Sequence, residues 1–328
     1  MFSAGITLLF TVASSISVHQ ELTDLINYTP GKSPIIITCP HTSNFQPIYI
    51  PSRKTGCFIQ KTQMCNYTRE AIVYCKNDAE ERQRCTPSTK METGVKSICK
   101  EIANELYRWG IFPYLLILDI GRLKVDVNRN MYEGTQDNPV AISIYEKYHS
   151  KIRKVINQNS GRVILFDIHG HAQIPNWIEL GYGLKGRQLN TGKYRATDTT
   201  INSLFKESTF KNKTIFDFIV GKEGFGHFIR MEDPDMLVVP SEEFLGPEGN
   251  HYFSGGYTTV TYGRYPYASA IQIELPRAIR KPRYIKSTGR VLGRAIAKFA
   301  LKHNLITSSV NQHKNFERFK LFFYDEYL

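Results

Sequence analysis

The segment RVILFDIHGH, residues 162–171, joins an apolar run to a group of side chains that can do chemistry. Residues 163–166 are continuously apolar, which is typical of a strand buried on both faces of an α/β sheet. Asp167, His169 and His171 follow this run, and ligands of open α/β sheets bind where strands end. Asp167 and His169 are two positions apart, so they share one face of a strand. The group indicates either a metal site or a pair of structural histidines.

Two further candidate ligands flank other expected elements. Residues 34–38 read PIIIT, and this β-branched run predicts a strand that ends just before His41. Apolar residues at helical spacing predict a helix over residues 94–108, and Glu92 lies directly ahead of it. A carboxylate there is either a partner of the helix dipole or a ligand held by a rigid element.

Polar side chains also follow or interrupt two later strands. An expected strand over residues 114–120 leads into a loop with Asn128 and Arg129, whose amide and guanidinium suit a carboxylate ligand. The alternative is a solvated loop arginine. The strand expected at residues 268–275 contains Glu274, which is costly to bury without a partner. That glutamate is either half of a salt bridge or a base that faces a metal.

The order of the elements predicts the fold class. Helices are expected at residues 140–157 and 286–303, so helices alternate with apolar strands along the chain. This alternation predicts an α/β protein with a mainly parallel or mixed central sheet flanked by helices. Residues 172–253 show a looser pattern, with a short ordered piece at 215–220, and we expect long loops there that shape a cleft.

The N-terminus and the cysteines indicate export. Residues 1–18 combine an apolar stretch with small residues, as a signal peptide does, which leaves a single domain over residues 19–328. All six cysteines lie between Cys39 and Cys99, and six cysteines allow fifteen pairings. Residues 42–90 hold four of them without any long periodic pattern, so we expect a disulfide-stapled insertion. Three Asn-x-Thr sequons are compatible with a secreted glycoprotein; they start at Asn27, Asn66 and Asn212.

The chain is basic, with a formal net charge of +12. A basic surface can attract anionic glycans weakly, or acidic substrates. The basic residues are scattered and no nucleic-acid-binding motif is present, so we expect no nucleic-acid partner. The apolar N-terminal stretch is too short for a transmembrane segment, and none is expected.

The order of the motifs carries a resemblance to a known family. The chain reads PH, then E-x-G ahead of a helix, then R-x(3)-D-x-N-R, then D-x-H-G-H, then Q-x-E on a late strand. Over residues 35–276 this order resembles the N-formylglutamate amidohydrolase family, which is similar to zinc carboxypeptidases. The resemblance implies a three-layer, zinc-carboxypeptidase-like α/β fold.

The resemblance also implies a role for each matching residue. One Zn²⁺ per chain would be bound by His41, Glu92 and His169. Glu274 matches the general base, Arg122 the arginine that steadies the oxyanion, and Asn128 with Arg129 the pair that holds a substrate carboxylate. Asp167, Asp126 and His171 are expected to line or orient the site. Glu92 lies across the insertion from His41, and Val95 stands where relatives have threonine, so Asp167 and Asp126 are the alternative acidic ligands.

Together these features predict a secreted zinc hydrolase. It would cleave an amide bond in a small molecule or peptide with a free carboxylate, either an N-acyl amino acid or a C-terminal peptide bond. A metal-activated water would attack, with a glutamate as general base. The alternatives are a secreted non-catalytic binding protein on the same scaffold and a polysaccharide deacylase.

Overall fold

The computed structural model describes residues 25–75, 79–159, 161–208 and 214–307. The expected signal peptide and the sequon at Asn212 lie outside these residues. Contacts divide the chain into two compact units. The first takes its described residues from Met1–Tyr28, Pro40–Met91 and Leu116–Lys151, and the second takes its described residues from Thr29–Cys39, Glu92–Leu115 and Ile152–Leu328. The single domain over residues 19–328 stays a prediction.

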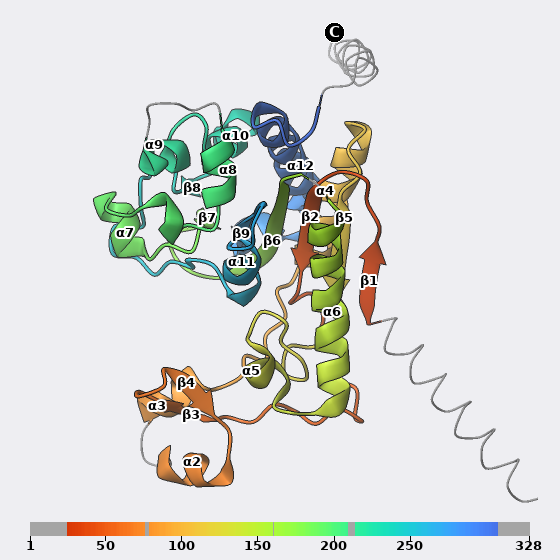
Figure 1. The fold of residues 1–328 in the computed structure, drawn as a ribbon, viewed down its shortest axis with the longest axis vertical. Coiled ribbons are helices and arrows are strands. Elements are labelled where there is room, and N and C mark those ends of the chain that lie inside the picture. The colour runs from red at the N-terminus through yellow and green to blue at the C-terminus, as the bar shows by residue number, and fades with distance from the viewer. Residues whose placement is uncertain (1–24, 76–78, 160, 209–213, 308–328) are drawn as a thin grey trace, which may run out of the picture. The chain divides into compact units, whose positions relative to one another are not determined.

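The described strands form one seven-stranded sheet and a separate two-stranded sheet. In spatial order the larger sheet contains β1 (Ile26–Thr29), β5 (Tyr114–Leu118), β2 (Ile35–Cys39), β6 (Val163–His171), β9 (Ala268–Pro276), β7 (Ile178–Gly181) and β8 (Val238–Val239) (Figure 1). Strand β6 runs parallel to β2 and β9, and β7 runs antiparallel to β9. The predicted α/β fold with a mixed, mostly parallel sheet is confirmed.

Helices cover both faces of the sheet in the second unit. The Phe166 ring of β6 lies 5.1 Å from that of Phe225 in α10 (Phe225–Glu232) and 6.4 Å from that of Phe299 in α12 (Ile285–Lys302). The next residue, Asp167, points to the opposite face because side chains alternate along a strand. There it contacts Thr259 of α11 (Tyr257–Tyr262). The sheet is therefore the middle of three layers.

The longer helices form where the sequence predicts them. Helix α4 covers Val95–Arg108 and α12 covers Ile285–Lys302, and each buries one apolar face. The two helices pack closely, since a Cβ added to Gly289 would lie 2.3 Å from the Glu101 Cβ atom. Helix α6 covers Pro139–Gln158.

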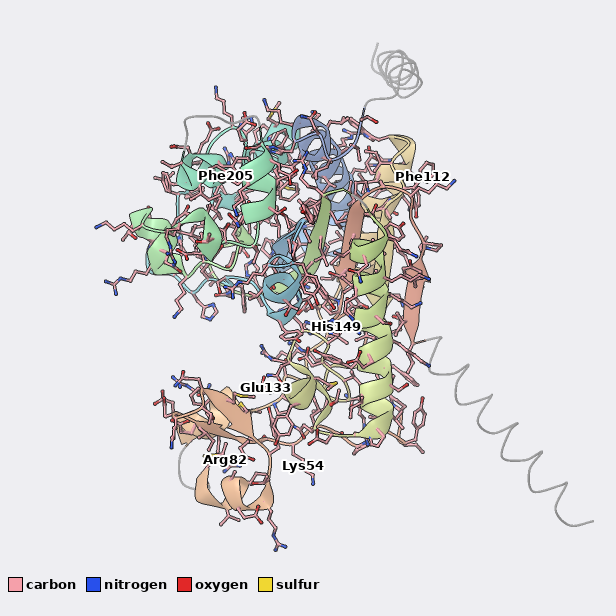
Figure 2. All side chains as sticks on the ribbon, in the orientation of Figure 1. Lys54, Arg82, Phe112, Glu133, His149 and Phe205 are labelled. Atoms are coloured by element: carbon pink, nitrogen blue, oxygen red, sulfur yellow. A yellow bond between two sulfur atoms is a disulfide. The ribbon has the colours of Figure 1, made fainter. Side chains whose placement is uncertain are left out.

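The insertion belongs to the first unit, and disulfides stabilise it in place of a large hydrophobic core. Its short elements are β3 (Cys57–Ile59), β4 (Met64–Asn66), α2 (Arg69–Tyr74) and α3 (Ala79–Arg84). The pairs Cys57–Cys75 and Cys65–Cys85 connect these short elements. The first unit also contains α5 (Met131–Thr135). The third pair, Cys39–Cys99, lies in the second unit, where it joins β2 to α4. Lys54 and Arg82, labelled in Figure 2, belong to this insertion.

The expectation of long loops over residues 172–253 is wrong. Besides β7 and β8, this stretch contains α7 (Gly186–Thr191), η2 (Ala196–Asp198), α8 (Asn202–Glu207), α9 (Ile215–Val220) and α10. These helices have three to eight residues, which is too short for a clear 3.6-residue period. Strand β9 is followed by η3 (Arg277–Arg280) and η4 (Pro282–Tyr284). Across the described part of the chain, no helix has the length and apolar character needed to cross a membrane.

Candidate metal centre

Strand β6 ends in a buried aspartate–histidine pair. The His169 Nε2 atom lies 3.0 Å from Asp167 Oδ2, and both side chains are almost fully buried. The Thr38 hydroxyl donates to the other oxygen of Asp167 at 2.6 Å. Asp167 and His169 share one face of the strand, as their spacing predicts. The fixed carboxylate therefore sets the orientation of the His169 ring.

Glu92 approaches His169 from the start of α4. Its carboxylate lies 3.3 Å from His169 Nδ1, and it accepts a hydrogen bond from the Gly170 backbone amide at 3.1 Å. The chain turns into α4 through Gly94, whose φ of 88° is in the left-handed region that favours glycine. The E-x-G motif thus places an acidic side chain beside a histidine 77 residues further along the chain.

The surroundings of His169 favour a positive charge. Burial alone would lower its pKa, but the carboxylates of Asp167 and Glu92 outweigh burial and raise the pKa well above the usual value. The protonated imidazole in turn lowers the pKa of a third acid, Glu274. The imidazolium form of His169 thus balances part of the charge of the acids around it.

Glu274 is buried on β9 and lies opposite His169 in the parallel register. Gln272 donates to its carboxylate at 3.0 Å. Burial raises the pKa of Glu274 to about 8; His169 opposes this rise, and the nearby charges of Glu92 and Glu179 add to it. In the absence of a cation, this side chain therefore holds a proton at neutral pH.

A second histidine–carboxylate pair occurs in the first unit. His41 Nε2 lies 2.8 Å from Asp126 Oδ1, and both residues are buried. Asp126 also pairs with Arg53 at 3.2 Å and with Arg122 at 3.3 Å. Burial would raise the pKa of Asp126, but the charges of Arg122, His41 and Arg53 hold it well below the usual value. The ionised carboxylate fixes the His41 ring, as Asp167 fixes that of His169.

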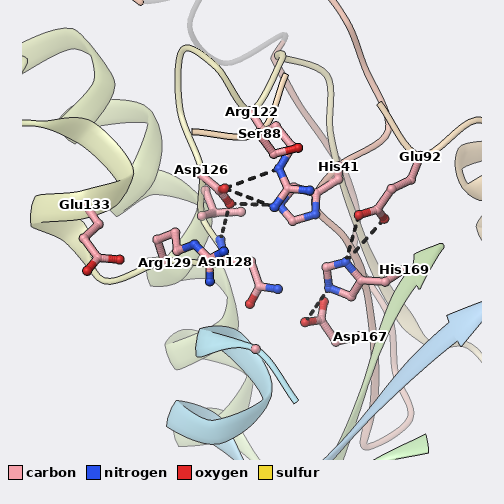
Figure 3. A network of polar contacts seen from close by, with 12 residues as sticks. His41, Ser88, Glu92, Arg122, Asp126, Asn128, Arg129, Glu133, Asp167 and His169 are labelled. Carbon is pink, nitrogen blue, oxygen red and sulfur yellow. Dashed lines mark hydrogen bonds and ion pairs between the residues drawn. The ribbon is translucent and has the colours of Figure 1, made fainter. Parts of the chain in front are cut away.

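The three residues of the predicted ligand set come from both units, His41 from the first and Glu92 and His169 from the second. His41 follows β2 by two residues, and β2 pairs with β6 so that Thr38 is opposite Asp167. Figure 3 shows both histidine–carboxylate pairs and Glu92. Within the second unit, the carboxylate of Glu92 and the imidazole of His169 are donors that could hold a metal ion, and the role of His41 in binding it stays a prediction.

His171 has a different environment. Its Nδ1 atom accepts from the Gln173 backbone amide at 3.2 Å, so its Nε2–H donates to the Trp177 carbonyl at 2.9 Å. Burial lowers its pKa, which agrees with a neutral ring. His171 therefore stabilises the connection between β6 and β7 and is not one of the three predicted ligands.

The predicted substrate-binding residues lie near Asp126 in the first unit. Asn128 is buried, and its backbone amide donates to Asp126 at 3.1 Å. Arg129 is exposed and lines a pocket of about 320 Å³. The insertion forms one wall of that pocket through residues that include Phe58, Tyr67 and Arg84.

The sequence analysis missed several buried polar residues. Glu179 is fully buried opposite Glu274, and Trp177 and the Phe253 amide donate to it at 3.2 and 2.8 Å. An acid inside the apolar segment WIELG was the signal that could have found it. Arg53 has no such signal, because it lies in the insertion, where no periodic pattern marks buried positions.

The fold resembles solved structures at low sequence identity. An N-formylglutamate amidohydrolase from Ralstonia eutropha JMP134 is 14% identical over 86% of this chain and 99% of that chain, with a TM-score of 0.46. A gene product of Agrobacterium tumefaciens is 10% identical over 90% of this chain and 96% of that chain, with a TM-score of 0.42. No protein-family model and no curated protein matches the sequence.

Proposed function

We propose that this chain is a secreted zinc-dependent hydrolase. It would cleave the amide bond of an N-acyl amino acid, or a C-terminal peptide bond, next to a free carboxylate. The observation that carries the proposal is His169 of the second unit, whose ring nitrogens lie 3.0 Å from the buried carboxylate of Asp167 and 3.3 Å from that of Glu92. The proposed metal ligands are His41, Glu92 and His169.

The donor set suits zinc. Two imidazoles and one carboxylate are a common ligand set of catalytic zinc sites, which keep a fourth position for water or substrate. The Nε2 atom of His41 contacts the buried carboxylate of Asp126, and that of His169 contacts the buried carboxylate of Asp167. These contacts support Nδ1 as the metal-binding atom of both rings. The raised pKa of His169 also supports a cation at this place. We expect one zinc ion per chain.

When bound, zinc supplies Lewis-acid chemistry that lowers the pKa of a coordinated water to about 7. Glu274 would accept a proton from the attacking water and pass it to the leaving amine as the carbon–nitrogen bond breaks. Its place opposite His169 in the register supports this role. For this step Glu274 must be ionised, and a nearby cation favours its charged form.

The arginines would bind the substrate. Arg122 would stabilise the negative charge that develops on the carbonyl oxygen, an effect typically worth about 3 kcal/mol of the barrier. Asn128 and Arg129 would hold the substrate carboxylate, and the exposure of Arg129 supports its access to a ligand. Three disulfides and the predicted signal peptide support secretion, and the net charge of +12 supports weak binding to anionic glycans.

Metal analysis of the purified protein tests the proposal. We expect about one zinc per chain in the wild type, and loss of that zinc in His169→Ala. His171→Ala is the matched control, because it removes an imidazole from the same strand that is bonded only to backbone groups; it should keep the metal. A wild-type protein that is folded but binds no zinc would favour the non-catalytic binding protein instead.

The zinc-loaded protein should hydrolyse N-acyl amino acids and peptides with a free C-terminal carboxylate. The same compounds with an amidated carboxyl group should react more slowly, because Arg129 then has no carboxylate to bind. Equal rates on both forms would contradict the substrate class.

A further inference from the structure

We propose that Arg280 is a positioning residue that aligns the three segments carrying Glu92, His169 and Glu274. The inference rests on the proposed function, which assigns those residues to metal binding and base catalysis. Arg280 is the last residue of η3, four positions after the end of β9, and its side chain is buried.

One guanidinium group donates to a backbone carbonyl in each of the three segments. Nε donates to the Leu275 carbonyl at 3.0 Å, Nη2 to that of His171 at 2.8 Å, and Nη1 to that of Thr93. Thr93 and Leu275 directly follow Glu92 and Glu274, and His171 is two residues after His169. Because the guanidinium is planar and rigid, it fixes the three carbonyls relative to one another.

The glycines of two motifs leave room for this arginine. A Cβ atom added to Gly170 would lie 2.6 Å from the Arg280 Cζ atom, so any larger residue between His169 and His171 would displace the guanidinium. A Cβ on Gly94 would lie 2.4 Å from the Arg280 carbonyl oxygen. The E-x-G and H-G-H motifs are therefore both shaped to accommodate Arg280.

The charge of Arg280 acts on the same groups. Burial lowers its pKa, while the nearby carboxylates of Glu92 and Glu274 oppose that shift. Its hydrogen bonds go to backbone carbonyls, so its charge lowers the cost of burying these acids without occupying their oxygens. Arg280 thus orders the backbone of the site and leaves both carboxylates available.

The test compares zinc affinity, measured by competition with a chelator, among Arg280→Ala, Arg280→Lys and Arg277→Ala. Arg280→Ala should lower the affinity by about 10–100-fold, the usual effect of losing a group that supports metal ligands. The zinc affinity of Arg280→Lys should lie between those of the wild type and Arg280→Ala, because one ammonium group does not reproduce the rigid, planar set of donors of the guanidinium. Arg277→Ala removes the same charge from an exposed position of the same short helix and should leave the affinity unchanged.

A second variant, Gly170→Ala, retains the arginine but forces its guanidinium to move, so it should weaken zinc binding as well. The melting temperature of each variant in excess chelator separates stability from metal binding, since a merely structural role would change only that temperature. If Arg280→Ala does not fold, Arg280→Lys and Gly170→Ala decide the question. Folded variants with wild-type zinc affinity would overturn the inference. A wild-type chain that binds no zinc would overturn the proposed function before any variant is compared.

Discussion

Each histidine of the candidate metal centre is held through the same ring nitrogen. His41 Nε2 faces Asp126 and His169 Nε2 faces Asp167, and both carboxylates are buried and bonded to further groups. A carboxylate beside one ring nitrogen holds the ring in one orientation. Each ring is thus oriented before a metal binds, which lowers the entropic cost of binding one.

The raised pKa of Glu274 gives a pH-dependent stability in metal-free protein. Between pH 4.5 and about 8 the folded chain keeps a proton that the unfolded chain releases, so wild-type stability falls as the pH rises through this range. The Glu274→Gln variant has an amide in place of this carboxyl group, and the amide does not ionise. In chelator, its melting temperature relative to the wild type should therefore rise from pH 4.5 to pH 8 and then stay constant.

Thermal unfolding followed by circular dichroism at several pH values measures this difference. Glu248→Gln, which changes an exposed acid, serves as the control and should follow the wild type at every pH. A difference for Glu274→Gln that is the same at pH 4.5 and pH 8 would contradict the raised pKa.

At the scale of single residues, the sequence selected Glu92 and His169, which lie 3.3 Å apart, but not the hydrogen bonds that hold them. The selection of His41 as a further ligand stays a prediction. The two backbone bonds of His171 depend on the turn after β6, which the sequence pattern does not specify. Arg280 was missed because its role depends on three carbonyls from distant segments, and carbonyls carry no sequence signal.

At the scale of elements, the N-terminus of α4 is restricted by Gly94. This residue has a φ of 88°, and a Cβ atom would lie 2.4 Å from a backbone oxygen of η3, which cannot move as a flexible side chain can. Glu92 precedes this turn by two residues. The position of Glu92, the proposed acidic ligand, therefore depends on a glycine two residues away.

Gly94→Ala should reduce the free energy of unfolding by at least about 2 kcal/mol, since the left-handed backbone alone costs about 1–2 kcal/mol in an L-residue. Gly161→Ala is the control, because a Cβ there has no neighbour within 4 Å, and its effect should stay within about 0.5 kcal/mol. Urea unfolding measures both. Equal values for the two variants would show that the turn tolerates a side chain.

Elements with a long apolar period were predicted within one or two residues. The expected helix over 94–108 is α4 at Val95–Arg108, and the expected strand over 268–275 is β9 at Ala268–Pro276. The short helices α7, α8 and α10 were missed, because six to eight residues bury too few side chains to show a period. Their positions depend on contacts with the rest of the chain.

At the scale of the whole molecule, the disulfides divide into two groups by what they connect. Cys57–Cys75 and Cys65–Cys85 lie within the insertion. Cys39–Cys99 instead joins β2, which leads to His41, to α4, which starts after Glu92, across a separation of 60 residues. Which of the fifteen pairings forms could not be predicted, because pairing follows from the fold and not from cysteine spacing.

The double variant Cys39→Ala/Cys99→Ala should therefore lose both stability and zinc affinity. In the chain-entropy view, a closed loop of 60 residues contributes about 4 kcal/mol. Cys57→Ala/Cys75→Ala should lower stability while zinc affinity stays near that of the wild type. Denaturant unfolding and chelator competition measure the two effects. Unchanged zinc affinity in the first variant would show that the bond does not support the site.

The Cys39–Cys99 bond also determines what happens when a protease cuts the insertion. A single cleavage beside Lys54, an exposed residue, would leave two fragments joined through that sulfur–sulfur link. The shorter fragment would carry His41, and the longer would carry Glu92 and His169. The nicked protein would thus keep all three side chains in one covalent particle, and the fragments would separate only after treatment with a thiol.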